Sequence, residues 1–106
     1  MFARNVSVHL KSNMLSEYGH VFDSQILPLL RKQKGFRDEI TIASSNGLDV
    51  TAISLWDNKA DAETYNNNTY PEVVKSLSKV IDGSPRVQTC EVLNSTFHKI
   101  DVPVHA

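Results

Sequence analysis

The sequence predicts an α+β fold in which four antiparallel β-strands form one sheet and helices cover one of its faces. Three patterns predict it: apolar residues alternate along residues 6–10, apolar residues recur at helical spacing in two later segments, and Asn46-Gly47 separates two β-rich runs. The resulting order is strand, helix, strand, strand, helix pair and strand. This order is the split βαβ plan of a ferredoxin-like domain.

The spacing of apolar residues predicts the first strand and the first helix. The strand alternates apolar and polar positions, with Val6, Val8 and Leu10 on one face. Ser16 can cap the following helix, whose apolar stripe consists of Tyr18, Phe22, Ile26, Leu29 and Leu30. Pro28 predicts a kink near Ser24, because the proline ring clashes with the carbonyl four residues earlier. Gly35 suits the left-handed position just after the helix end.

The middle of the chain predicts a hairpin. Residues 37–44 and 48–56 are rich in strand-forming side chains, and they flank Ser45-Asn46-Gly47. Asn-Gly between two such runs is the strongest short hairpin signal, because both residues tolerate the positive φ angles of a tight turn. We therefore expect these two strands to pair.

The second half of the chain predicts two helices and a last strand. Asp57 or Asn58 can cap a helix that runs to about residue 67. Pro71 suits the first turn of the next helix, whose stripe consists of Val73, Val74, Leu77, Val80 and Ile81. We expect residues 82–85 to end that helix and residues 86–100 to form one long strand.

Composition limits the class of protein. A chain of 106 residues that is 41% hydrophobic suits one domain, which we expect at residues 1–100, with a C-terminal tail at 101–106. The net charge of −1 leaves no basic surface for nucleic acid or anionic lipid, so we expect neither as a partner. The chain has one cysteine and neither a signal-peptide pattern nor an apolar run of membrane-spanning length, and we expect a cytoplasmic protein.

The strand at residues 48–56 predicts a homodimer. Ala52, Ser54 and Trp56 share one face, and Ile53 and Leu55 share the other. Neither face is polar enough to stand in water, but the predicted helices can cover only one. The simplest cover for the second face is the same face of another copy, which closes a two-fold barrel of two sheets.

The sequence predicts no metal site and no cofactor. His9, His20, His98 and His105 share no ligand spacing, and Cys90 stands alone as a small apolar side chain. His9 alternates with Val6 and Val8, so it can lie inside the barrel and act as a base near neutral pH. Phosphate-binding glycine loops, paired cysteines and nucleophile elbows are absent from the sequence. Any reaction must therefore rely on the reactivity of the substrate itself.

The chain resembles the antibiotic biosynthesis monooxygenase family of dimeric α/β barrels from about Val6 to Leu93. Four features carry the resemblance: Phe22 on the first helix, Lys34-Gly35-Phe36 after it, Trp56-Asp57-Asn58-Lys59-Ala60-Asp61-Ala62, and Arg86-Val87 through Glu91-Val92. The third resembles the family signature Trp-x-Ser-x-x-Ala, with Asn58 in place of the serine. The resemblance implies a ferredoxin-like dimeric barrel. It implies activities that range from cofactor-free oxygenation of phenols to haem degradation.

The resemblance also implies where a site lies. Trp56 matches the family's pocket tryptophan, although a large aromatic residue at this corner is equally consistent with core packing. The oxygenases place Asn and Tyr where this chain has Ala52 and Ala62, so Ser54 and Tyr65 or Tyr70 would supply hydroxyl groups instead. The haem-degrading branch uses Asn, Trp and an axial His at the positions held here by Val6, Tyr65 and Lys75. Haem degradation is therefore disfavoured.

Two hypotheses about function follow. The first is a cofactor-independent monooxygenase-like enzyme that acts on a small aromatic or enolisable metabolite, with a substrate pocket lined by Phe22, Ser54, Trp56 and Tyr65 and with no catalytic residue assigned. The second is a non-catalytic dimeric barrel that binds a small hydrophobic ligand. The absence of the usual Asn and Tyr beside Trp56 favours the second hypothesis.

Overall fold

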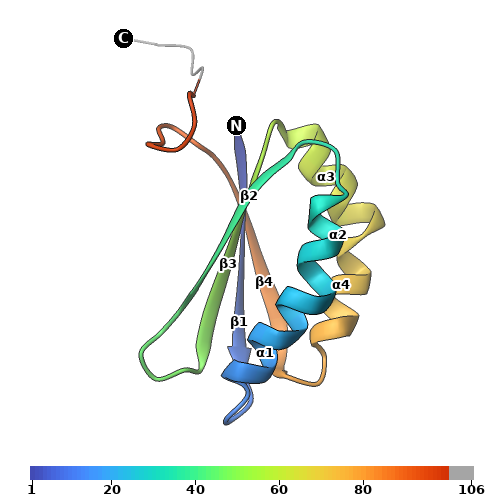
Figure 1. Ribbon diagram of the computed structural model, residues 1–106, viewed down its shortest axis with the longest axis vertical. Helices are drawn as coiled ribbons and strands as arrows, with labels where there is room; N and C mark the ends of the chain where they lie inside the picture. Colours follow the sequence, from blue (N-terminus) through green and yellow to red (C-terminus); the bar gives the residue numbers. More distant parts are fainter. Residues whose placement is uncertain (101–106) are drawn as a thin grey trace.

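The computed structural model describes residues 1–100 and shows one sheet with a helical layer on one face (Figure 1). The elements in chain order are β1 (Phe2–Leu10), α1 (Leu15–Val21), η1 (Phe22–Ile26), α2 (Leu27–Arg31), β2 (Phe36–Ala43), β3 (Asp49–Trp56), α3 (Lys59–Asn68), α4 (Tyr70–Leu77) and β4 (Ile81–Glu91). The strands are antiparallel, in the order β2-β3-β1-β4. The predicted ferredoxin-like α+β fold is confirmed. The predicted tail, residues 101–106, lies outside the described residues.

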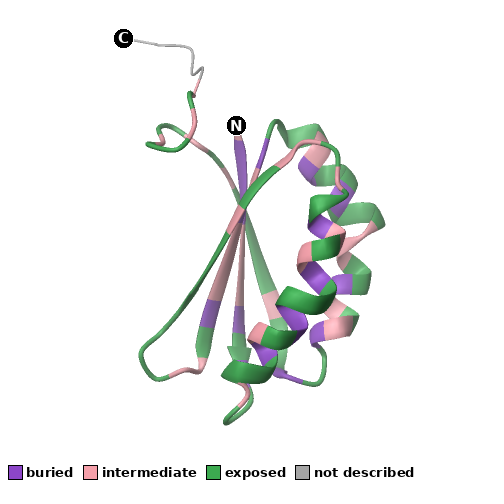
Figure 2. Ribbon diagram, viewed as in Figure 1, coloured by how far each residue is buried: buried purple, intermediate pink, exposed green. Residues whose placement is uncertain are grey.

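The hydrophobic core lies between the sheet and the helices, where the buried residues gather (Figure 2). Strand β1 contributes Phe2, Val8 and Leu10 to this core, with Val6 packed against it, and strand β3 contributes Val50 and Trp56. The helical layer contributes Tyr18, Phe22, Ile26, Leu30, Val73 and Leu77. Period-two strands and period-3.6 helices therefore meet as the sequence predicted.

The first helix is irregular at the predicted place. Residues Phe22–Ile26 form a π-helical turn, in which the N–H of Leu27 donates to the carbonyl of Phe22 five residues earlier. Pro28 follows in the first turn of α2, and its missing N–H and its ring explain why an α-helical bond to Ser24 cannot form. The predicted cap at Ser16 is wrong. The helix starts at Leu15 after Met14, which makes no side-chain capping bond, because Ser16 already lies inside the first turn.

The turns and the later helices agree closely with the sequence pattern. Gly35 and Gly47 have positive φ angles, as the helix end and the hairpin require. Asn58 caps α3, since its Oδ1 accepts the N–H of Asp61 at 2.9 Å. Helix α4 has Pro71 in its first turn, but it ends at Leu77, earlier than predicted.

The last strand lies at residues 81–91 instead of the predicted 86–100. Residues 82–85, predicted as a loop, form the start of this strand and contain a bulge opposite β1. Gly83 has the positive φ angle that a bulge favours, and Pro85 is tolerated because β4 is an edge strand. The strand stops near Glu91 because its only partner, β1, begins at Phe2. The last bond in this register runs from the N–H of Val92 to the carbonyl of Met1, at 3.0 Å.

The side of the sheet away from the helices carries an apolar patch. We call Ile40, Ile42, Ile53 and Leu55 the outer patch: they lie on β2 and β3, with Ile40 56% and Ile42 52% exposed. On β1 the neighbouring positions are Ala3 and then the polar Asn5 and Ser7, and His9 pairs there with Asp49. Within residues 1–100, the helices are too short and too polar to cross a membrane.

The two glycines near the first helix make a matched pair for testing the fold. A Cβ at Gly35 would lie 2.7 Å from the Cβ of Asp61, and the residue has a φ of +80°. We expect Gly35→Ala to lower the free energy of unfolding by about 1–3 kcal/mol, because it adds backbone strain and a clash. Gly19→Ala, where nothing lies within 4 Å of the added Cβ, should raise it by about 0.5–1 kcal/mol. Urea denaturation followed by circular dichroism measures both changes, and equal effects would contradict this account.

Candidate functional site

A row of polar side chains crosses the helix-facing side of the sheet. Glu39 of β2 pairs in register with Ser54 of β3, Ser54 pairs with Arg4 of β1, and Arg4 pairs with Thr89 of β4. We call these four residues the polar row. On β1 they interrupt an otherwise apolar face, because the positions on either side of Arg4 along this face are Phe2 and Val6. Polar groups under a helical layer cost free energy unless they are hydrogen-bonded, so their concentration on one line marks the place where a site is expected.

A cavity of about 30 Å³ lies over the polar row, between the sheet and the helices. Its polar lining comes from Arg4, Glu39 and Ser54 on the sheet and from the tyrosines of the helical layer, Tyr18, Tyr65 and Tyr70. Its apolar lining includes Phe22, Ile26 and Ala52. In this form the cavity has room for one or two water molecules.

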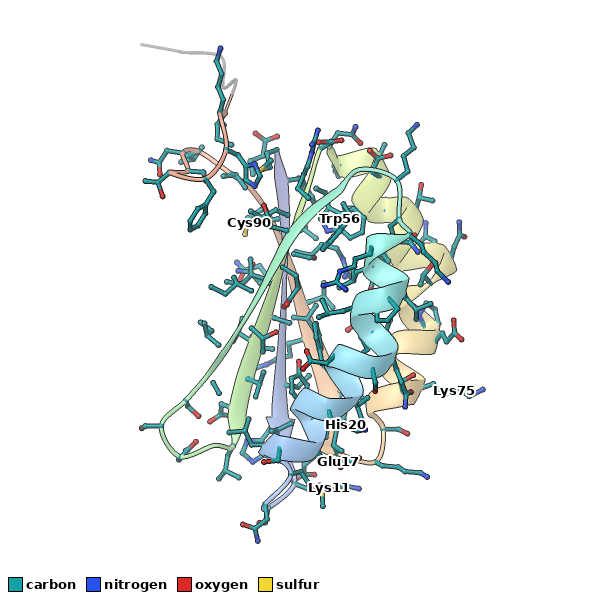
Figure 3. All side chains as sticks on the ribbon, in the orientation of Figure 1. Lys11, Glu17, His20, Trp56, Lys75 and Cys90 are labelled. Carbon is teal, nitrogen blue, oxygen red and sulfur yellow. The ribbon has the colours of Figure 1, made fainter. Side chains whose placement is uncertain are left out.

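Trp56 lies behind this cavity and supports it. The side chain is completely buried on the helix-facing side of the sheet, whereas Cys90 lies on the other side (Figure 3). Its Nε1 donates a hydrogen bond to the Oγ of Ser54 at 2.9 Å. Its ring packs against Tyr65, with ring centroids 5.0 Å apart, and edge-on against Phe36. Trp56 therefore fixes the positions of two residues that line the cavity.

Arg4 is the most unusual residue of the site, because it is a cation that is only 2% exposed. Its guanidinium lies over the rings of Tyr65 and Tyr70, at 5.0 and 4.5 Å from their centroids, and it donates to the Oδ1 of Asn66 at 2.8 Å. Among the described residues, no carboxylate lies within ion-pair distance of it. Burial lowers the pKa of Arg4, while the two tyrosines oppose that shift. The cavity therefore has one wall with a buried positive charge that lacks an anion.

Glu39 lines the same cavity from the far end of the polar row. One of its carboxylate oxygens accepts a hydrogen bond from the Thr41 hydroxyl at 2.6 Å. Burial raises the pKa of Glu39, the bond from Thr41 opposes that shift, and the charge of Asp23 adds to it. Desolvation of this kind disfavours the ionised carboxylate, so Glu39 binds a proton more tightly than an exposed glutamate does.

The tyrosine hydroxyls of the cavity are protonated donors. Burial raises the pKa of Tyr18 far above its ordinary value, and it raises the pKa of Tyr65 to about 12 even though Arg4 opposes the shift. Burial also raises the pKa of Tyr70. In the described part of the chain, the Tyr70 hydroxyl oxygen is buried without a hydrogen-bond partner. It is therefore free to bond to a ligand in the cavity.

The structure brings together most of the residues that the sequence singled out. Phe22, Ser54 and Tyr65 line the cavity, and so does Tyr70. Trp56 touches two of these residues but does not itself line the cavity. His9 lies on the outer side of the sheet, and Lys75 is an exposed residue of α4 away from the cavity.

Sequence reasoning missed Arg4 and Glu39. The sequence did contain a signal for Arg4. Arg4, Val6 and Val8 are spaced two residues apart on one strand, so Arg4 lies on the same face as the two valines and faces the helices with them. Glu39 gave no such signal. It alternates with Ile40 and Ile42, and those isoleucines suggest a buried face that turns out to be the outer one.

Clusters of side chains that could hold a metal ion are absent from residues 1–100. His98 pairs with Asp38 at the end of the sheet, and His20 is an exposed residue of α1.

The hydrogen bond between Trp56 and Ser54 allows a direct test of the site. We expect Ser54→Ala to lower the free energy of unfolding by about 1–3 kcal/mol, because it leaves a buried N–H without an acceptor. In a Trp56→Phe background, the same substitution should cost clearly less, since the donor is already gone. Urea denaturation followed by circular dichroism gives all four stabilities. Additive effects of the two substitutions would show that the bond contributes nothing.

Comparison with known proteins shows similarity in structure without recognisable similarity in sequence. No protein-family profile matches the chain, and a search of curated proteins returns no match. A monooxygenase of Streptomyces coelicolor in complex with the ligand nanaomycin D is similar in structure, with a TM-score of 0.76 and 14% identity over 92% of each chain.

Two further structures show the same similarity. SnoaB, a cofactor-independent oxygenase of Streptomyces nogalater, has a TM-score of 0.74 and 9% identity over 90% of this chain and 95% of that one. A Bordetella bronchiseptica protein, proposed by its name to be an antibiotic biosynthesis monooxygenase, has a TM-score of 0.74 and 12% identity over 88% of this chain and 97% of that one. The chain therefore has the fold of proteins that are named antibiotic biosynthesis monooxygenases.

Proposed function

We propose that this protein is a cofactor-independent, monooxygenase-like enzyme that acts on a small aromatic or enolisable molecule in the cavity over the polar row. The observation that carries the proposal is a buried arginine in the wall of an aromatic-lined cavity, with no carboxylate partner among residues 1–100. A reaction of this kind passes through an ionised substrate, and a preorganised cation in a dry site stabilises such an anion. The similar structure of a cofactor-independent oxygenase supports the proposal.

The lining of the cavity suits a flat substrate. Tyr18 and Phe22 stack along the helical layer, with ring centroids 5.8 Å apart, and Tyr65 and Tyr70 flank Arg4. Aromatic walls with a few convergent polar groups are typical of small-molecule sites. Ser54 and Tyr70 provide hydroxyl groups where the sequence lacks the Asn and Tyr of the oxygenases it resembles.

A ring-shaped substrate requires the cavity to open. A groove of about 270 Å³ lies beside α3, and Arg4 lines both this groove and the cavity. Asn66, an exposed residue that bonds to Arg4, also lines the groove. Movement of Asn66 and Arg4 would join the two spaces, so we propose the groove as the route of access. The monooxygenase that was solved with nanaomycin D has a similar structure and holds a ligand.

The second candidate function is binding of a small hydrophobic ligand without catalysis. The small size of the cavity and the alanines at positions 52 and 62 favour it. Ala52 lines the cavity itself, and Ala62 lines the adjoining groove. Turnover distinguishes the two functions, whereas binding alone does not.

We also propose that two copies pair through the outer patch. Its four apolar side chains are the uncovered half of a two-sided sheet, and closed homodimers bury such surfaces. The cavity lies on the opposite face, so each subunit would keep its own site.

Oxygen consumption tests the enzymatic proposal. We expect the purified protein to accelerate oxygen uptake in the presence of anthrone or 1,4-dihydroxynaphthalene above the rate in buffer. Ala52→Leu should reduce this acceleration at least about ten-fold while the protein stays folded, because a larger side chain fills the cavity at a cost of about 1–3 kcal/mol. Thr51→Val, at the neighbouring position on the outer side of β3, is the matched control and should keep the activity. Ligands that raise the melting temperature without any oxygen uptake would favour the binding function.

Light scattering at several concentrations tests the proposed dimer. We expect the wild-type protein to have the mass of two chains, and the double variant Ile40→Lys, Ile42→Lys to have the mass of one, because charges in the outer patch oppose its burial. Leu15→Lys is the control, since Leu15 is an apolar residue that is 40% exposed but lies on the helical layer. A wild-type monomer at micromolar concentration would refute the dimer.

A further inference from the structure

We propose that Glu39 is the base that removes a proton from the bound substrate and that Arg4 holds the anion that forms, with Ser54 between them. This inference rests on the proposed function for the kind of reaction. It goes further by assigning the two chemical roles to two residues. Neither residue belongs to the motifs through which the sequence resembles the oxygenases.

The register of the sheet sets the distance between the two groups. Glu39 and Arg4 lie in one line across the sheet and are separated by the strand that carries Ser54. Neighbouring strands are about 4.8 Å apart, so the two Cα atoms are about 10 Å apart. Both side chains line the same cavity, yet they form no ion pair within the described residues. A substrate can therefore lie between them and touch both.

Within the described residues, neither Arg4 nor Glu39 has a partner of opposite charge, so a substrate can supply an anion to Arg4 and a proton to Glu39. Arg4 uses one hydrogen bond, to Asn66, and otherwise faces the rings of Tyr65 and Tyr70. Glu39 accepts one hydrogen bond, from Thr41. A half-buried carboxylate at one end of a cavity can accept a proton, and a buried guanidinium at the other end stabilises the negative charge that develops.

The proposed step transfers one proton and requires no oxidant. The bond that breaks is a C–H that is conjugated across the ring with a carbonyl group, and the new bond is the O–H of the Glu39 carboxyl group. The electron pair stays on the substrate and is delocalised onto its oxygen, which accepts hydrogen bonds from the guanidinium of Arg4. Dioxygen, the co-reactant of the proposed function, reacts with this anion afterwards. The separation of the two residues favours a conjugated ring whose acidic hydrogen and oxygen lie at opposite ends.

Other groups of the cavity are less suited to act as the base. Tyr18 and Tyr65 remain protonated, because burial raises the pKa of both. Histidines are absent from the part of the cavity lining that the structure describes. The titration of Glu39 is influenced by Asp23 of η1, Tyr18 of α1 and Thr41 of its own strand, and Asp38 and His98 lie beyond it on the outer side. Because Glu39 must be ionised to act, the rate should rise as the pH rises through its pKa.

Hydrogen–deuterium exchange of anthrone under anaerobic conditions tests the base. The acidic CH₂ group of anthrone lies across the ring from its carbonyl, and its exchange in D₂O needs no oxygen. We expect the wild-type protein to accelerate this exchange and Glu39→Gln to lose on the order of 100-fold of the acceleration. Glu72→Gln, the same substitution at an exposed residue of α4 outside the cavity lining, is the control and should exchange at the wild-type rate. Wild-type exchange in Glu39→Gln would refute the role of Glu39.

Binding of 4-nitrophenol tests Arg4, because the anion of this probe absorbs visible light. Below the pKa of the free probe, we expect the wild-type protein to bind it as the phenolate. Arg4→Met should weaken phenolate binding by about 10- to 100-fold but leave the binding of uncharged nitrobenzene unchanged, which also shows that the variant is folded. Arg4→Lys should restore part of the loss. Glu39→Gln should bind the phenolate at least as well as the wild type, since it removes a negative charge. Equal phenolate binding by Arg4→Met and the wild type would refute the role of Arg4.

Oxygen uptake separates this inference from the proposed function. Exchange and phenolate binding without oxygen uptake would refute the oxygenase and keep the two residue assignments. Oxygen uptake that is unchanged in Glu39→Gln and in Arg4→Met would keep the oxygenase and refute the assignments. A wild-type protein that neither exchanges anthrone nor binds 4-nitrophenol would refute the assignments as well.

Discussion

The burial of one positive charge under the helical layer constrains the rest of this structure. Removing an ammonium- or guanidinium-sized ion from water costs several kcal/mol unless other groups replace the lost hydration. Here the replacement comes from two tyrosine rings and one asparagine, all on α3 or at the start of α4. Cation–π contacts contribute about 0.5–2 kcal/mol each, so Arg4 holds these two helices against β1 while it keeps an unpaired charge in the cavity. Stability and the proposed chemistry therefore depend on the same contacts.

The two faces of the sheet differ in composition and in what packs against them. The helix-facing side buries the core and carries the polar row, so it contains both the packing and the cavity. The outer side carries the apolar patch on β2 and β3, whereas on β1 it carries Ala3 and then polar residues. A four-stranded sheet with only one helical layer always leaves such a second face, and its composition decides whether that face meets water or another chain. The composition of this face is the basis of the proposed dimer.

The fold is shared with the similar structures, but the polar residues of the cavity differ from those that the resemblance implies. Trp56 stands at the position that resembles the pocket tryptophan of the antibiotic biosynthesis monooxygenases, but here its indole N–H is used to orient Ser54. The resemblance implies larger polar residues at the positions of Ala52 and Ala62, but in this chain the charged groups of the cavity come from other strands, Arg4 from β1 and Glu39 from β2. A fold supports different arrangements of a site because any position on the buried face of the sheet can supply a side chain.

The sequence by itself determined the order of the elements, the hairpin at Asn46-Gly47, the irregular turn before Pro28 and the phase of β1, because these depend on local backbone preferences and on the periods of strands and helices. Only the tertiary structure decided where β4 begins and ends, since that depends on how much of β1 is available for pairing. The tertiary structure also decided which face of β2 meets the helices. Glu39 lies on that face, and the apolar Ile40 and Ile42 lie on the outer side. Glu39 and Ser54 come from the two strands of the hairpin, whereas Arg4 comes from β1, which is distant from the hairpin in sequence. Their alignment is a property of the register between strands, which local sequence patterns do not contain.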